Sequence, residues 1–275
     1  MKPTELAKAA EGKDTGDRLP VLFIGHGSPM NGIEVNAYSD SWKALGKEIP
    51  APKAVLCISA HWLTEGTAVT AMKRPRTIHD FGGFPKALFD VRYPAPGGPG
   101  LAQEIKDAIP DPAIHLDHDW GLDHGTWTVV RHMYPKADIP VLQLSIDYHK
   151  PGQYHYDLGR KLAGLRRKGY LIVGSGNMVH NLRMIAFDRI DEPEYGFDWA
   201  LEMQASFRKN ILEGNHAALV KYENLGPAAK LAVPTPDHYY PLLYVLGAME
   251  KGEAPVLFND KAVGGSLTMT SVKTG

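Results

Sequence analysis

The chain has 275 residues, 44% of them hydrophobic and 22% charged, a composition typical of a globular protein with a sizeable core. Thirty basic residues against 31 acidic ones give a formal charge of −1, which argues against nucleic acid or an anionic membrane surface as a partner. The single cysteine, Cys57, excludes an internal disulfide and a cysteine-rich metal cluster. Residues 1–18 lack the apolar core of a signal peptide, so we expect a flexible N-terminus on a soluble, cytoplasmic protein.

Three short apolar runs lead to a histidine and predict buried strands. The run at 20–24 reaches His26, the run at 54–60 reaches His61, and the run at 170–173 is followed by His180. In an open α/β sheet, ligands bind outside the carboxyl ends of the strands. We therefore expect these three histidines to follow the ends of their strands and to converge on one crevice.

The remaining elements alternate between helices and strands. In chain order the pattern predicts a helix over 37–46, a strand over 68–72, irregular stretches over 76–85 and 93–100, a helix over 101–109, a strand over 114–117, a helix from His124 to Pro135, a strand over 139–146, helices over 153–168, 197–212, 216–222 and 239–249, and closing strands at Phe258 and 266–272. This alternation predicts an α/β fold, a three-layer α/β/α single domain over residues 19–275 around a mostly parallel or mixed sheet.

Five histidines occupy equivalent places in this pattern, because each follows a strand end or opens a helix: His26, His61, His124, His180 and His238. A single histidine beside a turn is more often a surface or capping group than a ligand. These five lie 35, 63, 56 and 58 residues apart, which is the spacing of separate strand units that meet at one rim. We therefore predict a metal centre built by distant segments, with His79 as a weaker candidate.

Other chemistries have less support in the sequence. Ser28 and Ser59 lie near histidines, but no G-x-S-x-G elbow surrounds either of them, which disfavours a serine hydrolase. The glycine pairs complete neither a G-x-G-x-x-G nor a P-loop pattern, so no nucleotide site is indicated. Cys57 lies within an apolar run, where it is expected to pack as a small hydrophobic residue.

The histidine-bearing segments resemble a known family over residues 19–275. Seven collinear motifs carry the resemblance: Gly25-His26-Gly27-Ser28-Pro29, Ser59-Ala60-His61-Trp62, His79-Asp80-Phe81-Gly82-Gly83-Phe84-Pro85, Tyr93-Pro94-Ala95-Pro96-Gly97, Asp123-His124-Gly125-Thr126-Trp127, Gly174-Ser175-Gly176 with His180-Asn181-Leu182-Arg183, and Pro236-Asp237-His238-Tyr239. Together they are similar to the DOPA 4,5-dioxygenase type of class III extradiol ring-opening dioxygenases. The resemblance implies a single catalytic domain with one non-haem divalent metal.

The resemblance also implies an activity and residue roles. The enzyme would open a catechol-type ring of a DOPA-like substrate with dioxygen, giving a muconic semialdehyde. His26, His61 and His238 would bind the metal, while His180 and His124 would be the acid/base and substrate-binding histidines. His180 could instead be a fourth ligand. Ferrous iron is implied for ring cleavage, whereas an all-imidazole site also suits zinc, which has no redox chemistry.

Aromatic residues in and beside the irregular stretches complete the predicted site. Trp62, Phe81, Phe84 and Tyr93 are expected to form an apolar cage for a flat ring, and the alternative is that they fill the core beneath a long loop. The expected partners are a small-molecule catechol and dioxygen, without nucleic acid or membrane, and the oligomeric state is left open. Two rival functions remain, a zinc-dependent hydrolase and a non-catalytic metal-binding protein.

Overall fold

The computed structural model describes residues 18–275 of the chain. The N-terminal segment that is expected to be flexible, residues 1–18, therefore lies outside the described residues except for Arg18. In the described part, no helix is long and apolar enough to cross a membrane.

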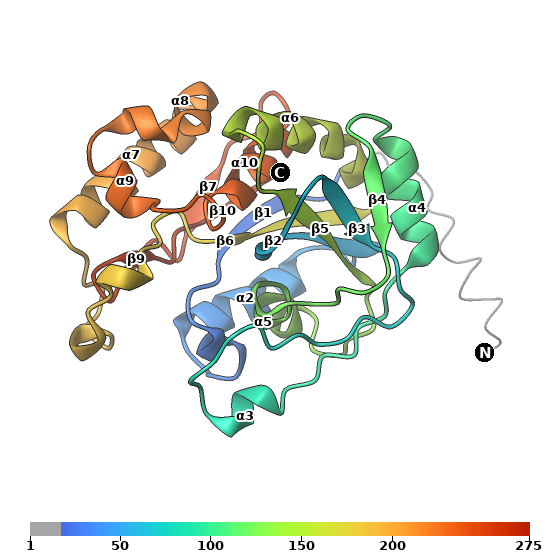
Figure 1. Ribbon diagram of the computed structural model, residues 1–275, viewed down its shortest axis with the longest axis horizontal. Helices are drawn as coiled ribbons and strands as arrows, with labels where there is room; N and C mark the ends of the chain where they lie inside the picture. The colour runs from blue at the N-terminus through green and yellow to red at the C-terminus, as the bar shows by residue number, and fades with distance from the viewer. Residues whose placement is uncertain (1–17) are drawn as a thin grey trace.

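A central eight-stranded sheet has the order β4-β3-β5-β2-β6-β1-β10-β7 (Figure 1). Its neighbours β5, β2, β6 and β1 pair in parallel, whereas β10 pairs antiparallel with β1 and β3 pairs antiparallel with β5. The two remaining strands, β8 and β9, form a separate antiparallel pair. The strands are β1 (Val21–Gly25), β2 (Ala54–Thr64), β3 (Thr67–Thr70), β4 (Ile114–Asp117), β5 (Val141–Asp147), β6 (Tyr170–Gly176), β7 (Val256–Phe258), β8 (Ala262–Val263), β9 (Leu267–Thr268) and β10 (Ser271–Thr274).

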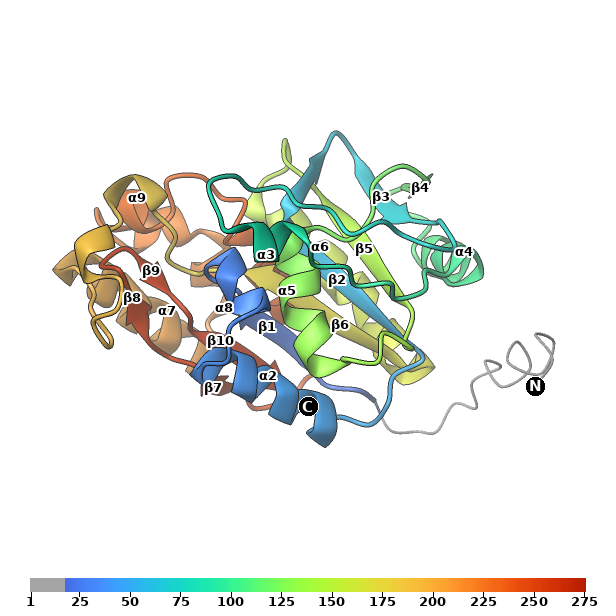
Figure 2. The same ribbon diagram turned by 90° about the horizontal axis from the view of Figure 1, so that it is seen from below.

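Helices cover both faces of this sheet. The α-helices are α2 (Ala37–Glu48), α3 (Lys86–Phe89), α4 (Pro99–Ala108), α5 (His124–Met133), α6 (Gly152–Leu162), α7 (Asp198–Leu212), α8 (His216–Val220), α9 (Ala229–Ala232) and α10 (Tyr240–Ala248). Short 3-10 helices are η1 (Pro29–Gly32), η2 (Ala163–Lys168), η3 (Leu182–Met184), η4 (Phe187–Arg189) and η5 (Tyr222–Leu225). Helices α6 and α10 pack on one face, and α2 and α5 pack on the other (Figures 1 and 2). The predicted three-layer α/β/α architecture with a mixed sheet is confirmed.

The two helical layers leave the inner strands without a solvent side, so β1 is a continuous apolar run, and even the polar residues that alternate along β5 (Gln143, Ser145 and Asp147) are buried. Every residue of β1, β5 and β6 is buried, because a strand covered on both faces has no solvent side. One hydrophobic cluster lies between the sheet and the α6 and α10 layer, and the other lies between the sheet and the α2 and α5 layer. Cys57 of β2 belongs to the second cluster, and burial raises the pKa of its thiol.

Strand β2 differs from the prediction in a way that affects the site. His61 lies within β2, not beyond its end, because pairing with β5 resumes after a break: Ile58 pairs with Leu144, and Leu63 pairs with Ile146. The extra residues between these two pairs form an irregularity that contains His61. Such a bulge bends a strand locally and redirects its side chains.

The predicted helix over 153–168 also differs, since α6 ends at Leu162 and continues as the 3-10 helix η2. Gly164 weakens the α-helix just after this point. Gly169, with φ of +84°, then ends the segment in the left-handed conformation that glycine adopts most easily.

A buried ion pair between η2 and the chain after α10 gives a stability prediction. Arg166 and Glu253 have side chains 0% and 1% exposed, and Arg166 also donates to the carbonyl oxygens of Leu19 and Ala248. Replacing Glu253 by alanine should destabilise the fold by about 3–5 kcal/mol, because a buried guanidinium loses its counter-charge. Denaturant unfolding of Glu253→Ala measures this loss. Glu250→Ala is the control, because the partly exposed ion pair of Glu250 with Arg167 should contribute about 1 kcal/mol or less.

The same pair predicts how stability depends on pH. Burial alone would raise the pKa of Glu253, but hydrogen bonds from Arg166, the Glu250 backbone and Arg18 lower it to about 2. A carboxyl whose pKa falls on folding stabilises the native state above its unfolded pKa. That contribution should disappear in wild-type protein as the pH falls from about 5 to 2, and should be missing at every pH in Glu253→Ala. Equal pH dependence in the two proteins would contradict it.

Candidate metal centre

The fold brings all five predicted histidines to one edge of the sheet, by different local routes. His26 follows β1 directly, His61 lies in the irregular part of β2, and His124 is the first residue of α5. His180 comes four residues after the end of β6, and His238 lies two residues before the start of α10. His26, His124 and His238 are buried, and His61 and His180 are partly exposed.

Two glycines make room for this convergence. A side chain on Gly125 would place its first carbon 2.9 Å from Cδ2 of the His61 ring and 2.5 Å from Oγ of Ser59. At Gly176, the same carbon would come within 2.2 Å of the carbonyl oxygen of His238. All three distances are too short for a side chain at these positions, so Gly125 allows α5, and Gly176 allows β6, to approach the histidine-bearing segments closely.

The imidazole rings form one contiguous group. The ring centre of His26 lies 5.1 Å from that of His61, 5.6 Å from that of His124 and 5.4 Å from that of His238. His61 and His124 are 3.9 Å apart, and His61 and His238 are 4.9 Å apart. His180 stacks on His238 at 3.5 Å with the planes inclined by 5°. The predicted cluster of five histidines therefore forms.

Hydrogen bonding determines which ring nitrogen of His26 is available to bind a metal. The Ser175 hydroxyl donates to the carbonyl oxygen of Gly125 at 2.5 Å, so its oxygen accepts from Nδ1–H of His26 at 3.0 Å. The proton of the His26 ring therefore lies on Nδ1, and Nε2 carries a lone pair. Burial, followed by the neighbouring histidines, lowers the pKa of His26 well below its usual value, so the ring is neutral.

Three other rings also turn Nδ1 away from the centre. Nδ1 of His124 donates to Oδ2 of Asp80 at 3.0 Å, and Nδ1 of His61 lies 3.4 Å from the same oxygen. Nδ1 of His238 bonds to Oδ2 of Asp237. Metal-binding histidines typically use one ring nitrogen for a carboxylate or hydroxyl and present the other to the metal.

This arrangement fits a bound divalent cation. Nε2 of His26 and Nε2 of His61 lie 3.2 Å apart, and with both Nδ1 atoms protonated their lone pairs face each other. A cation beside the two nitrogens would turn this repulsion into ligation. One ring nitrogen from each of His26, His61 and His124 lies within 4.8 Å of the others. Neutral imidazole is the form that binds metals, and burial together with the nearby histidines also lowers the pKa of His61.

His180 has a lowered pKa, as His26 and His61 do. Burial and the nearby His238 ring lower its pKa to about 2, although the charge of Asp237 acts in the opposite direction. The surroundings therefore hold the His180 ring in its neutral form. Its backbone N–H donates to the carbonyl oxygen of Ala232, so the position of this segment does not depend on the ring.

Two carboxylates that support the histidines are absent from the predicted site. Asp80 accepts from the backbone N–H and the ring of His124. Asp123 is fully buried, caps α5 through the backbone N–H of Thr126, and accepts from Ser59 and Gln143. Asp80 and Asp123 both lie inside the motifs that carry the family resemblance. Those motifs are the sequence signal that could have indicated the two carboxylates, because neither residue has a metal-ligand spacing of its own.

The aromatic residues predicted to hold a substrate divide into two groups. Phe81 packs edge-on against His124 with ring centres 5.5 Å apart, and Phe84 packs against Phe81 at 5.4 Å. Trp62 instead stacks on Trp120, and the Tyr93 hydroxyl donates to the carbonyl oxygen of Tyr134. The structure thus places Phe81 and Phe84 beside the histidines and gives Trp62 and Tyr93 other contacts. Substrate binding by Trp62, Phe84 and Tyr93 stays a prediction.

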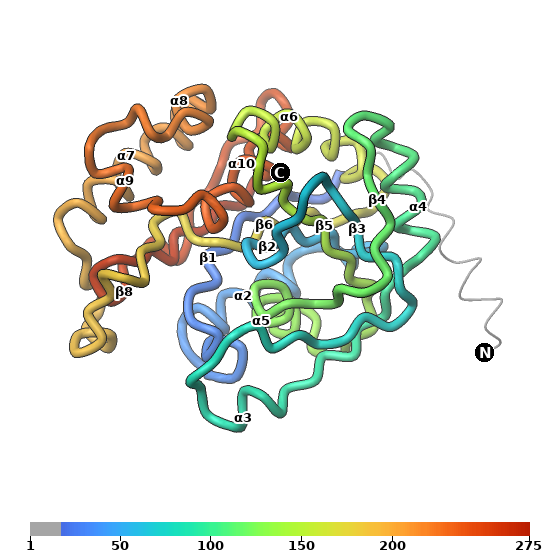
Figure 3. Tube along the Cα trace, viewed as in Figure 1, coloured from blue at the N-terminus to red at the C-terminus, as the bar shows by residue number. Residues whose placement is uncertain are grey.

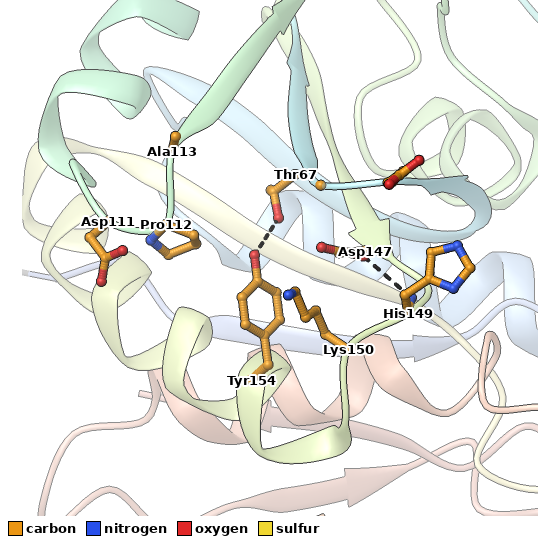
Figure 4. A pocket seen from close by; sticks show the side chains of 10 residues that line it. Thr67, Asp111, Pro112, Ala113, Asp147, His149, Lys150 and Tyr154 are labelled. Carbon is orange, nitrogen blue, oxygen red and sulfur yellow. Dashed lines mark hydrogen bonds between the residues drawn. The ribbon is translucent and has the colours of Figure 1, made fainter.

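A cavity elsewhere on the described surface is separate from this centre. It has a volume of about 540 Å³ and lies between β3, the end of β5 and the start of α6 (Figure 4). Its lining includes Thr67, Asp147, Lys150 and Tyr154, and none of the five clustered histidines. The group of described residues whose ring nitrogens lie close enough together to hold a metal ion, His26, His61 and His124, is not part of this cavity.

Comparison with known proteins agrees with the geometry. Residues 21–269 match the family described as the catalytic LigB subunit of aromatic ring-opening dioxygenase. The chain is 48% identical to a 4,5-DOPA dioxygenase extradiol of Escherichia coli (strain K12), over 94% of this chain and 95% of that protein. It is 38% identical to a protein of the same name from Beta vulgaris, over 92% and 95% of the two chains.

A solved structure supports the fold independently. The crystal structure of an uncharacterized protein from Escherichia coli K12 superposes with a TM-score of 0.81 at 42% identity, covering 94% of this chain and all of that one. LigB dioxygenases use a single non-haem metal, and the histidine cluster supplies ligands suited to one. The chain belongs to the LigB family of aromatic ring-opening dioxygenases.

Proposed function

We propose that the protein is an extradiol dioxygenase that opens a catechol ring of the DOPA type, adjacent to the two hydroxyl groups, and yields a muconic semialdehyde. The observation that carries the proposal is the set of clustered imidazoles whose Nδ1 atoms bond outward to a hydroxyl or a carboxylate, which leaves their Nε2 atoms for the interior of the cluster. Support also comes from relatives named 4,5-DOPA dioxygenase extradiol in a bacterium and a plant. A reducing cytoplasm would keep the metal ferrous.

The proposed ligands are His26, His61 and His238, as the motif resemblance implies. The ring of His238 lies at distances from His26 and His61 that suit a shared ion, and Asp237 fixes its outward nitrogen. His124, whose ring nitrogen also lies near those of His26 and His61, competes for the third position. In the proposed arrangement His124 instead hydrogen-bonds the substrate hydroxylate or dioxygen.

The proposed metal is ferrous iron, with zinc as an inactive occupant. When bound, iron would supply the path by which electrons pass from the catecholate to dioxygen, which zinc cannot do. The protein's own residues would bind and orient the ring and move protons. His180, whose ring stacks on that of His238, would take one hydroxyl proton of the catechol and return it as the ring opens. Phe81 and Phe84 would exclude water on the side of His124.

Oxygen uptake tests this function. Protein freed of metal and reconstituted anaerobically with ferrous iron should consume one dioxygen per catechol ring, with DOPA among the substrates of a catechol panel. Zinc-loaded protein should consume none. The rival zinc hydrolase would show the opposite pattern, with hydrolytic activity in the zinc form that disappears on exchange for iron. Absence of oxygen uptake with every catechol would refute the proposed function.

A further inference from the structure

One carboxylate oxygen in the cluster serves two histidines. Oδ2 of Asp80 accepts from Nδ1 of His124 at 3.0 Å and lies 3.4 Å from Nδ1 of His61. Oδ1 of Asp80 accepts the backbone N–H of His124 at 2.9 Å, which fixes the orientation of the carboxylate. The side chain of Asp80 is 19% exposed, so the contacts are largely shielded from water.

The position of Asp80 strengthens these contacts. Asp80 lies in the long connection that follows β3 and carries α3 before reaching α4 (Figure 3). Its carboxylate meets the N-terminus of α5, where the free backbone N–H groups favour a negative charge. Each of its two oxygens accepts a hydrogen bond from His124, Oδ1 from the backbone N–H and Oδ2 from the ring, which is the behaviour of a carboxylate.

The shared oxygen has a direct consequence for the ring nitrogens. A carboxylate can only accept hydrogen bonds, so it favours a proton on Nδ1 in both neighbouring rings. Each Nε2 then has a lone pair directed into the cluster. The rings of His61 and His124 are 3.9 Å apart, so a shift of the carboxylate would displace both.

From this geometry we infer that Asp80 is a positioning residue, which sets the tautomer and orientation of His61 and His124 together and so couples the metal site to the substrate-facing histidine. This inference rests on the proposed function only for the role of His124 toward substrate. The part that concerns His61 requires a metal site and no particular reaction.

Asp80→Asn tests the inference with almost no change in shape. In one orientation the new amide NH₂ group faces the two rings, and a ring proton must move to Nε2, which removes a ligand lone pair. In the other orientation the NH₂ group meets the backbone N–H of His124, a contact between two donors. We expect the apparent dissociation constant for zinc, measured by competition with a chromophoric chelator, to rise by about 10- to 100-fold.

Asp90→Asn is the matched control. Asp90 follows α3 in the same connection, and its exposed side chain pairs with Lys86. This variant should bind zinc as tightly as wild type. Thermal melting of the metal-free proteins separates positioning from folding: an unchanged zinc constant in Asp80→Asn, with or without a lower melting temperature, would overturn the inference. If Asp80→Asn does not fold, Asp80→Ala, which leaves space for water, takes its place.

A double variant tests whether the carboxylate is shared. In a His124→Ala background, Asp80→Asn should still weaken zinc binding about 10-fold, through His61 alone. Loss of that effect would show that Asp80 acts only on His124 and would overturn the shared role. If the iron-loaded wild type opens no catechol, the proposed function fails while these zinc measurements still decide the role of Asp80 at the metal.

Discussion

His26→Ala should leave the protein folded and without stoichiometric metal. His26 is 2% exposed, and its Nε2 faces Nε2 of His61 at 3.2 Å, so its removal takes away one of the proposed ligand nitrogens and leaves a gap in the ligand shell. Apparent free energies of about 10–16 kcal/mol for a four-ligand zinc site suggest a loss of roughly 10²- to 10³-fold in affinity per ligand. Elemental analysis after dialysis against a chelator measures it, and ring cleavage should disappear with the metal.

Parallel variants identify the full ligand set. His61→Ala and His238→Ala should lose metal as His26→Ala does, whereas His124→Ala should retain it. His115→Ala, at an exposed position of β4, is the control that changes the histidine count without touching the cluster. If His238→Ala retains metal and His124→Ala loses it, the third metal ligand is His124 and not His238. Wild-type metal content in the His26, His61 and His238 variants alike would make the ligand assignment wrong.

The second large effect is expected at His180. His180→Ala should retain iron and bind catechol but lose turnover by about 10²- to 10⁴-fold, the usual contribution of a positioned proton-transfer group. The backbone of His180 is held by its bond to Ala232 and by a β-bridge to Leu267, so the loss of the ring should not unfold the segment.

Metal content and oxygen uptake measured on the same His180→Ala sample decide between the two roles. If iron is lost together with turnover, His180 is a fourth ligand. His149→Ala, at an exposed position after β5, supplies the control and should match wild type in both measurements. Normal turnover in His180→Ala would remove this residue from the mechanism.

The architecture could be predicted because the strands that build it are unusually simple in sequence. Strands β1 and β6 are covered on both faces, so they appear as short apolar runs that lead into glycine, and a histidine follows each of them. The bulge in β2 could not be predicted, because it depends on where pairing with β5 resumes, which is a contact between distant segments. For the same reason, His61 was expected beyond a strand that in fact continues to Thr64.

The site was predictable to the extent that it follows strand ends. The convergence of the histidines came from topology, but the role of Asp80 depends on the path of a long connection, which no periodicity encodes. For Trp62, the alternation of side chains along a strand already indicated its direction in the sequence. Neighbouring residues of a strand point to opposite faces, so a residue next to His61 would be expected to turn away from the cluster, and Trp62 packs on Trp120.

The burial of Cys57 gives the folded protein a built-in reporter of its own opening. The thiol is 0% exposed in the middle of the central sheet, and burial raises its pKa, so a thiol reagent can modify it only in molecules whose sheet has opened. Because the chain has no second cysteine, every labelled molecule records that one event. Labelling rates with and without metal therefore measure how strongly an ion at the sheet edge holds the interior closed.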